Sequence, residues 1–277
     1  MTMASGRARA TILAITSGKG GVGKTNVVIN VAVAMARLGL RVGVLDADFG
    51  LGNVDVLLGL TPDAHVGHLV AGEKRLQDVV VDGPQGVRII PASSGIQSLT
   101  ALSAAQRERL VEAVHHACED LDFLLIDTAS GISDNVMHML GLAERVVLVT
   151  SLEPSAVVDA YALTKVFSKS DPDKEIGIVV NGARTADDAT LVFRQLETAT
   201  RRFLDRAVHF YGFVTDDPAV RDAVIVQRAI VEHLPQSPAS RCYRIVASRI
   251  AGLGPARGGL RLAHVGSGAQ MEVPQCA

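Results

Sequence analysis

Short runs of valine, isoleucine and leucine recur along the chain and alternate with longer segments whose apolar residues follow helical spacing. The short runs are typical of strands that are buried on both faces of a parallel sheet. They cover residues 11–17, 41–46, 87–91, 121–127, 145–151, 175–181 and 207–214. The segments with helical spacing, several of which begin at serine or aspartate in an N-cap position, cover residues 26–38, 103–119, 134–143, 155–168 and 186–204.

This alternation predicts an α/β fold, namely a mostly parallel sheet with helices on both faces, in which ligands bind beyond the carboxyl ends of the strands. A chain of 277 residues without internal repeats is interpreted as one such domain over residues 11–252. Residues 1–10 are expected to be a flexible N-terminus. Residues 253–277 are rich in glycine, proline and small residues without periodicity, and are expected to form a flexible tail.

Residues 18–25 read Gly-Lys-Gly-Gly-Val-Gly-Lys-Thr and match the phosphate-loop motif G-x-x-x-x-G-K-[ST] between a predicted strand and a predicted helix. Glycines let the backbone fold around an oxyanion, so that main-chain N–H groups and the helix dipole face the phosphates. Lys24 is expected to place its charge at the β- and γ-phosphates, and Thr25 its hydroxyl on Mg²⁺. The residues predicted to contact a nucleotide are Gly18, Lys19, Gly20, Gly21, Val22, Gly23, Lys24, Thr25 and Asn26.

Carboxylates stand at the ends of two predicted strands, with Asp46 and Asp48 after one and Asp127 after another. A carboxylate at the end of an apolar strand needs a cation or N–H donors to offset its burial. Asp46 and Asp127, together with Thr25, are therefore predicted to hold Mg²⁺, directly or through its water. Asp48 is predicted to accept a hydrogen bond from the attacking water and align it. A turn or N-cap role is the alternative for each aspartate.

Charge and cysteine content exclude several classes of protein. The formal net charge is −2, so no overall basic field predicts binding to nucleic acid or to a charged membrane. Cys118, Cys242 and Cys276 form no C-x-x-C pair, which disfavours disulfide frameworks and zinc or iron–sulfur sites. The apolar runs are too short for a membrane span or a signal peptide. A reducing cytoplasm is the expected location.

Residues 240–253 carry a further helical stripe of apolar side chains, with arginines at positions 241, 244 and 249 largely off the stripe. The stripe consists of Tyr243, Val246, Ile250 and Leu253. Two interpretations are open. The segment is either a closing helix that packs on the sheet with its arginines in solvent, or an amphipathic anchor that seeks a membrane surface.

The lysine-bearing loop at 19–25, with Asp46-Ala-Asp48 and Asp127-Thr-Ala-Ser-Gly131, resembles the deviant Walker A ATPases that include MinD and ParA. The resemblance implies an Mg²⁺-dependent ATPase that forms a homodimer in the ATP state. It also implies that Lys19 crosses to the partner subunit's ATP, so that the catalytic residues are Asp48, Lys19 and Lys24. A second cation would stabilise the interface and the charge of the phosphoryl-transfer transition state. Without the resemblance, Lys19 could equally be a solvated loop lysine.

Three longer segments, at residues 46–60, 91–98 and 153–163, are similar to one branch of that family, the flagellar-number regulators FlhG, also called FleN. In the family an asparagine at the end of a late strand reads the adenine, and a following strand end closes over the base. Asn181 and Asp217 match those places, with Thr215 where proline is expected. A strand-end cap is the alternative for Asn181.

The resemblance also implies flagellar partners, namely an FlhF-type GTPase, a component of the C-ring or a flagellar transcription activator. The N-terminal motif with which some of these regulators stimulate FlhF is not recognisable in residues 1–10. The C-terminal membrane-binding helix expected in the family is not recognisable either, because residues 260–265 are a short run flanked by glycines. Peripheral contact with the inner face of the cell membrane would then come through residues 240–253, or be absent.

Three functions are open. The first is an ATP-driven switch that controls the number or placement of flagella through ATP binding and slow hydrolysis. The second is a MinD- or ParA-like positioning ATPase for division sites or DNA, without sequence-specific nucleic-acid binding. DNA-binding members need a basic patch, which here would be Arg194, Arg201, Arg202 and Arg206, although such a cluster is more often a solvated helix face. The third, a metabolic P-loop enzyme, lacks a second polar cluster for an acceptor substrate.

Overall fold

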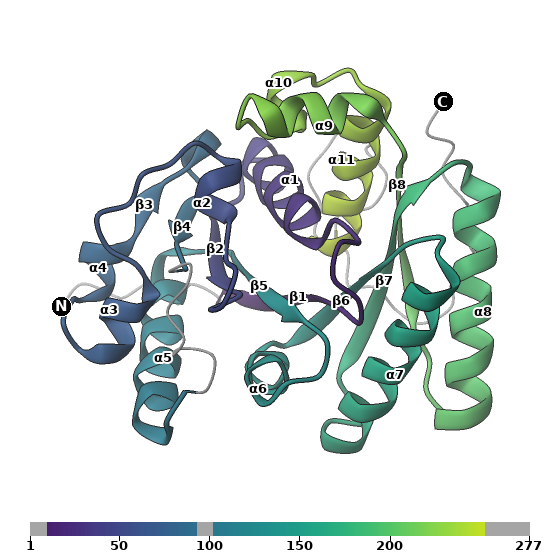
Figure 1. Ribbon diagram of the computed structural model, residues 1–277, viewed down its shortest axis with the longest axis horizontal. Helices are drawn as coiled ribbons and strands as arrows, with labels where there is room; N and C mark the ends of the chain where they lie inside the picture. Colours follow the sequence, from purple (N-terminus) through teal and green to yellow (C-terminus); the bar gives the residue numbers. More distant parts are fainter. Residues whose placement is uncertain (1–9, 93–101, 253–277) are drawn as a thin grey trace, which may run out of the picture.

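One sheet runs through the middle of the molecule, and helices cover both of its faces (Figure 1). The computed structural model describes residues 10–92 and 102–252. In these residues the strand order is β3-β4-β2-β5-β1-β6-β7-β8, and every neighbouring pair is parallel except β3 and β4. The strands are β1 (Thr11–Ser17), β2 (Val42–Ala47), β3 (Val81–Asp82), β4 (Arg88–Ile90), β5 (Phe123–Ser130), β6 (Arg145–Thr150), β7 (Glu175–Ala183) and β8 (His209–Thr215). The predicted α/β fold is confirmed.

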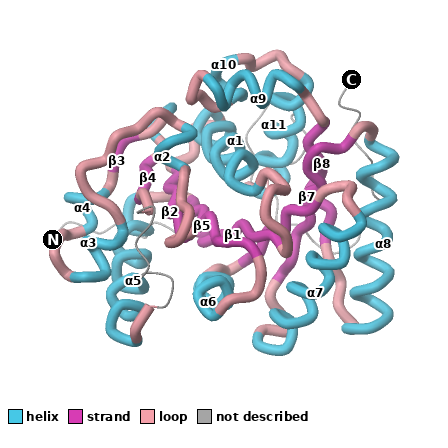
Figure 2. Tube along the Cα trace, viewed as in Figure 1, coloured by secondary structure: helices cyan, strands magenta, loops and turns pink. Residues whose placement is uncertain are grey.

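Two layers of helices enclose the sheet (Figure 2). One layer contains α1 (Lys24–Arg37) and α11 (Pro238–Ile250), with α9 (Pro218–Ile225) and α10 (Ile230–His233) beside them. The other contains α5 (Ala104–Ala117), α6 (Asp134–Leu142), α7 (Pro154–Ser170) and α8 (Ala186–Leu204). The remaining elements are α2 (Val54–Leu57), α3 (Val66–Ala71), α4 (Leu76–Val79) and the 3₁₀ turns η1 (Pro84–Gly86) and η3 (Cys118–Asp120).

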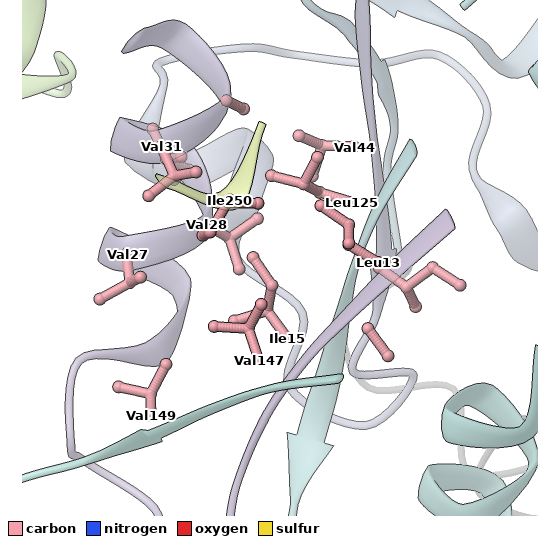
Figure 3. Close-up of a cluster of buried hydrophobic side chains, with 14 of the residues drawn as sticks. Leu13, Ile15, Val27, Val28, Val31, Val44, Leu125, Val147, Val149 and Ile250 are labelled. Carbon is pink, nitrogen blue, oxygen red and sulfur yellow. The ribbon is translucent and has the colours of Figure 1, made fainter. Parts of the chain in front are cut away.

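The core between α1 and the sheet is built from branched aliphatic side chains (Figure 3). Leu13 and Ile15 of β1 face Val28 and Val31 of α1, and all four are fully buried. Burying a side chain of this kind contributes about 1.5–3 kcal/mol. Because β-branched residues are stiff and fit a pleated surface, the same residues also favour the strands themselves. The loop that joins β1 to α1 is therefore anchored in rigid structure at both ends.

The closing helix α11 belongs to this core. Tyr243, Val246 and Ile250 are buried against α1 and the sheet, which confirms the closing-helix interpretation. The apolar stripe is therefore not free to bind a membrane. Its arginines, by contrast, are not solvated as expected, since Arg241 and Arg244 are half-buried and donate to backbone carbonyls. Among the described helices, none is both long and apolar enough to cross a membrane.

Several elements differ from the predicted ones. β5 continues past Asp127 to Ser130, because its pairing with β1 resumes at Ser130 after an irregularity. The pattern predicts none of the short helices α2, α3, α4, α9 and α10, since one or two turns bury too few apolar residues to show a period. The predictions for residues 1–9, for most of the family-like segment at 91–98 and for residues 253–277 lie outside the described residues.

The four arginines near the end of α8 do not form one patch. Arg206 is buried, where it donates to the carbonyl of Asp171 at 2.8 Å and to the carbonyl of Lys174. Arg201 pairs with Glu197 on the same helix at 3.1 Å. The candidate basic patch therefore does not include Arg206, because that residue holds the end of α7 against the start of β7.

Replacing Arg206 with glutamine is expected to lower the free energy of unfolding by about 2 kcal/mol, because two carbonyls lose a charged donor. Replacing the exposed Arg202 with glutamine is expected to change it by less than about 0.5 kcal/mol. Urea denaturation of both variants measures the difference. Equal stabilities would show that Arg206 contributes no more than a surface arginine.

Candidate functional site

The loop between β1 and α1 has the backbone that the phosphate-loop motif requires. Gly21 and Gly23 have φ angles of 82° and 83°, a left-handed conformation that favours glycine, and Gly23 is the N-cap of α1. Gly18 packs directly on α7, because a Cβ at this position would lie 2.3 Å from the carbonyl carbon of Asp159. The first N–H groups of α1 have no partner within the helix, so this end of α1 is suited to an anion.

Strand order brings the predicted carboxylates to the same edge of the sheet. β5 lies between β2 and β1, so that Asp127 is paired with Asp46 on one side and with Ile15 on the other. Asp46 and Asp127 are both buried. Two carboxylates side by side in a buried position need a cation, and the loop provides one.

Lys24, the first residue of α1, forms a buried ion pair with Asp127. Burial raises the pKa of Asp127, while the Lys24 ammonium and the Thr25 hydroxyl oppose that rise and the charge of Asp48 adds to it. Removing one partner of such a pair leaves an uncompensated charge in the protein. The pair therefore fixes the start of α1 to β5.

Asp46 organises the loop that follows β2. Its Oδ1 accepts a hydrogen bond from the N–H of Asp48 at 3.1 Å, and its Oδ2 accepts one from the N–H of Val54 at 3.1 Å. A Cβ on Gly52 would lie 2.8 Å from Oδ2, so only glycine fits there without a shift. Burial and the nearby charge of Asp127 raise the pKa of Asp46 to about 7.

Asp48 occupies a more open position than Asp46. It is half-buried, and its Oδ1 accepts a hydrogen bond from the N–H of Leu51 at 3.2 Å. Its charge acts on Asp127. Within residues 10–92 and 102–252, the second carboxylate oxygen of Asp48 accepts no hydrogen bond from the protein, so it keeps lone pairs that could position a water.

The donor set of this edge fits Mg²⁺. Thr25, Asp46 and Asp127 offer the oxygen ligands that Mg²⁺ prefers, and the carboxylates outnumber the one buried ammonium. The described residues contain no cluster of three or more His, Cys, Asp or Glu that could hold a metal. Phosphate oxygens and water would therefore complete the shell, and the ion would neutralise charge on the phosphates.

Lys19 has a different environment from Lys24. Its Nζ contacts the carboxylate of Glu153 and the hydroxyl of Ser155, 2.9 Å away, at the start of α7. The side chains of Lys19 and Glu153 are 37% and 65% exposed. Glu153 and Ser155 were not singled out as site residues from the sequence. Their position directly after β6, at the same edge as Asp46 and Asp127, is the signal that could have found them.

Asn181 lies beside the phosphate loop, and Asp217 lies at the start of α9. The Nδ2 of Asn181 donates to the carbonyl of Val22 at 2.8 Å, so Asn181 supports the loop itself. Asp217 is the N-cap of α9, where its Oδ1 accepts from the N–H of Ala219 and its Oδ2 from the N–H of Ala239. Their contact with adenine stays a prediction. Two further residues were predicted to contact the nucleotide. Val22 lies on the loop, and Asn26 lies in the first turn of α1.

The fold and the phosphate loop define a class of protein. The ParA family model, described as NUBPL iron-transfer P-loop NTPase, matches residues 9–251, and the chain belongs to this family of P-loop NTPases. Antiactivator FleN of Pseudomonas aeruginosa is 44% identical, over 86% of this chain and 85% of FleN. The flagellum site-determining protein YlxH of Helicobacter pylori is 32% identical, over 76% of this chain and 71% of YlxH.

A solved relative shares the architecture. The septum site-determining protein MinD of Pyrococcus horikoshii, complexed with Mg-ADP, superimposes with a TM-score of 0.72 at 25% identity. The match covers 87% of this chain and 96% of that one. The resemblance to MinD and ParA proteins, and to the FleN branch, is thereby confirmed.

The Lys24–Asp127 pair predicts a double-mutant cycle. Asp127→Ala is expected to lower the free energy of unfolding by about 3–5 kcal/mol, because it leaves the ammonium buried and unpaired. Adding Lys24→Met should restore most of that loss, since the unpaired ammonium is then removed. Denaturation of the nucleotide-free protein gives both values. Additive losses in the double variant would show that the two side chains do not interact in solution.

Proposed function

We propose that this protein is an ATP-driven switch that controls the number or placement of flagella. ATP binding closes a homodimer, whose closed form engages flagellar partners, and slow hydrolysis reopens it. The observation that carries the proposal is the contrast between the two loop lysines. Lys24 is locked into the buried pair with Asp127, whereas Lys19 is held at the surface by an exposed glutamate.

Lys24 and Asp48 carry the chemistry within one subunit. Lys24 lies at the start of α1, where its charge and the free N–H groups of the helix face the position of the phosphates. Asp48 follows the buried Asp46 on a loop that Asp46 itself anchors. From there Asp48 accepts a hydrogen bond from the attacking water and orients it for in-line attack. Asn26 completes the nucleotide site on the phosphate side, and Asn181 and Asp217 complete it on the base side.

Lys19 supplies the link between subunits. An exposed ion pair is worth about 0–1 kcal/mol, so Lys19 can leave Glu153 at little cost. A triphosphate on a second subunit offers it charge-assisted hydrogen bonds of greater strength. Transfer of Lys19 from Glu153 to the partner's phosphates therefore couples ATP binding to dimer formation, and loss of the γ-phosphate weakens that link.

The flagellar role rests on likeness to FleN and YlxH. The proposed partner is an FlhF-type GTPase, a C-ring component or a flagellar transcription activator. The proposed location is the cytoplasm, with peripheral contact to the membrane. Chromosome positioning is less well supported, because the buried Arg206 cannot belong to a DNA-binding patch. Deleting the gene and counting flagella by electron microscopy tests the role. An unchanged number and placement would contradict it.

Asp48→Ala is expected to slow ATP hydrolysis by about 10²-fold or more and to leave the ATP-bound dimer trapped, because the attacking water loses its orienting group. Phosphate release measures the rate, and size-exclusion chromatography after ATP addition measures the dimer. Asp63→Ala, which removes an exposed carboxylate from the loop before α3, is the matched control. Wild-type turnover in the Asp48 variant would remove this residue from the mechanism.

Lys19→Ala is expected to abolish ATP-dependent dimerisation while changing nucleotide affinity by less than about threefold, because the exposed Lys19 contributes little to binding within one subunit. Light scattering with a non-hydrolysable ATP analogue reports the dimer, and calorimetry reports the affinity. Lys165→Ala, an exposed lysine further along α7, is the control. A Lys19 variant that dimerises like wild type would refute the proposed link.

A further inference from the structure

Three arginines converge where α1, α10 and α11 meet, apart from the phosphate loop. Arg37 ends α1, and Arg241 and Arg244 belong to the first half of α11. Each guanidinium donates one hydrogen bond to a backbone carbonyl of residues 231–236. Arg37 reaches Val231 at 2.6 Å, Arg244 reaches Pro235 at 2.5 Å and Arg241 reaches Gln236 at 2.8 Å.

No carboxylate balances this cluster within the part of the chain that the structure describes. None of the three arginines forms an ion pair there. Glu232, the acidic residue in the same segment, instead pairs with Arg228 and accepts from Gln85. Burial and the charges of Arg37 and Arg241 lower the pKa of Arg244. The Arg244 guanidinium is therefore close enough to Arg37 and Arg241 to be repelled by both.

The cluster keeps many donors unused. A guanidinium has five N–H groups, and each arginine of the cluster donates one hydrogen bond to the described part of the chain. The Nε of Arg241 is buried and has no partner. Because the carbonyls fix the three side chains in place, little rotamer entropy is left to lose when an anion binds. Fixed guanidinium forks match the geometry of phosphate oxygens in particular.

The three hydrogen bonds to the segment between α10 and α11 do not explain why all three donors are charged. Each carbonyl could be satisfied by a neutral donor, whereas the mutual repulsion of the arginines opposes folding in the absence of an anion. Two leucines flank the cluster, namely Leu38 after Arg37 and Leu234 before Pro235, and they are 38% and 40% exposed. Exposed apolar side chains next in sequence to residues of a phosphate-binding cluster suit a headgroup at a lipid surface.

We propose that Arg37, Arg241 and Arg244 form a binding site for a phosphate group, carried by an anionic lipid headgroup or by a soluble phosphate. The site is independent of the nucleotide site, and it stands whether or not the protein is a flagellar switch. Because the apolar stripe of α11 is buried, contact with a membrane surface would involve these arginines and the exposed Leu38 and Leu234 instead.

Side-chain NMR of arginine gives a direct test, because the buried Nε–H of Arg241 reports its own surroundings. The full chain is first saturated with Mg·ADP, so that the phosphate loop is filled. Inorganic phosphate is then titrated at low ionic strength while the arginine Nε–H resonances are recorded. In a second arm, vesicles of equal parts phosphatidylglycerol and phosphatidylcholine are compared with pure phosphatidylcholine vesicles by co-flotation.

The proposal predicts a shift of the Arg241 Nε–H resonance with phosphate, or salt-sensitive flotation with the anionic vesicles, or both. A shift of the resonance without flotation identifies a soluble phosphate as the ligand. Flotation that is lost when the arginines are replaced identifies the lipid headgroup. Arg241→Gln/Arg244→Gln should weaken binding by at least about tenfold in whichever of the two measurements gives a signal, because two guanidinium groups are lost. Arg201→Gln/Arg202→Gln, which removes two exposed arginines from α8, should leave it unchanged.

Absence of both signals in the wild-type protein would overturn the proposal, and this outcome needs no variant to fold. Equal binding by the Arg241/Arg244 glutamine variant would overturn it as well. Arg241→Lys/Arg244→Lys keeps the charge and should keep most of the binding, which separates loss of charge from loss of structure. A shift of the Arg241 resonance with duplex DNA alone would assign the cluster to nucleic acid and reject the assignment made here.

Discussion

The buried contact between Lys24 and Asp127 is the interaction on which the phosphate edge of this protein depends. It ties the first residue of α1 to β5, the strand that lies between β2 and β1 in the sheet. Segments far apart in the sequence are thereby fixed around one short loop. Because both partners are out of water, neither can be removed without leaving a costly charge behind. The aliphatic core under α1 supplies the rigid frame against which this pair is held.

The same loop carries a second lysine in the opposite environment. The partner of Lys24 is 1% exposed, whereas the partner of Lys19 is 65% exposed. The first contact is hard to exchange for another, and the second is easy. A loop with one fixed and one exchangeable cation can hold its own nucleotide while it remains able to respond to a neighbour. This difference between the two lysine contacts is the physical basis of the proposed switch.

The fold class and the phosphate edge could be predicted from the sequence, whereas contacts between distant residues could not. Buried parallel strands leave apolar runs, and the residues after them reach one edge, which is why Asp46 and Asp127 were found. The contact of Lys19 with Glu153 joins two separate loops, and no local pattern shows it. Arg206 looked like part of a basic helix face, but it lies past the end of α8 and binds the carbonyl of Asp171. Short helices such as α2 and α10 leave no period to detect.

The phosphate edge carries more negative than positive charge, and a divalent cation is expected to complete it. Calorimetric titration of ADP into the nucleotide-free protein, with and without Mg²⁺, tests it most directly. We expect Mg²⁺ to strengthen binding by at least about tenfold, because the ion offsets the carboxylates that Lys24 leaves unpaired. Equal affinity with Mg²⁺ and with a chelator would contradict it.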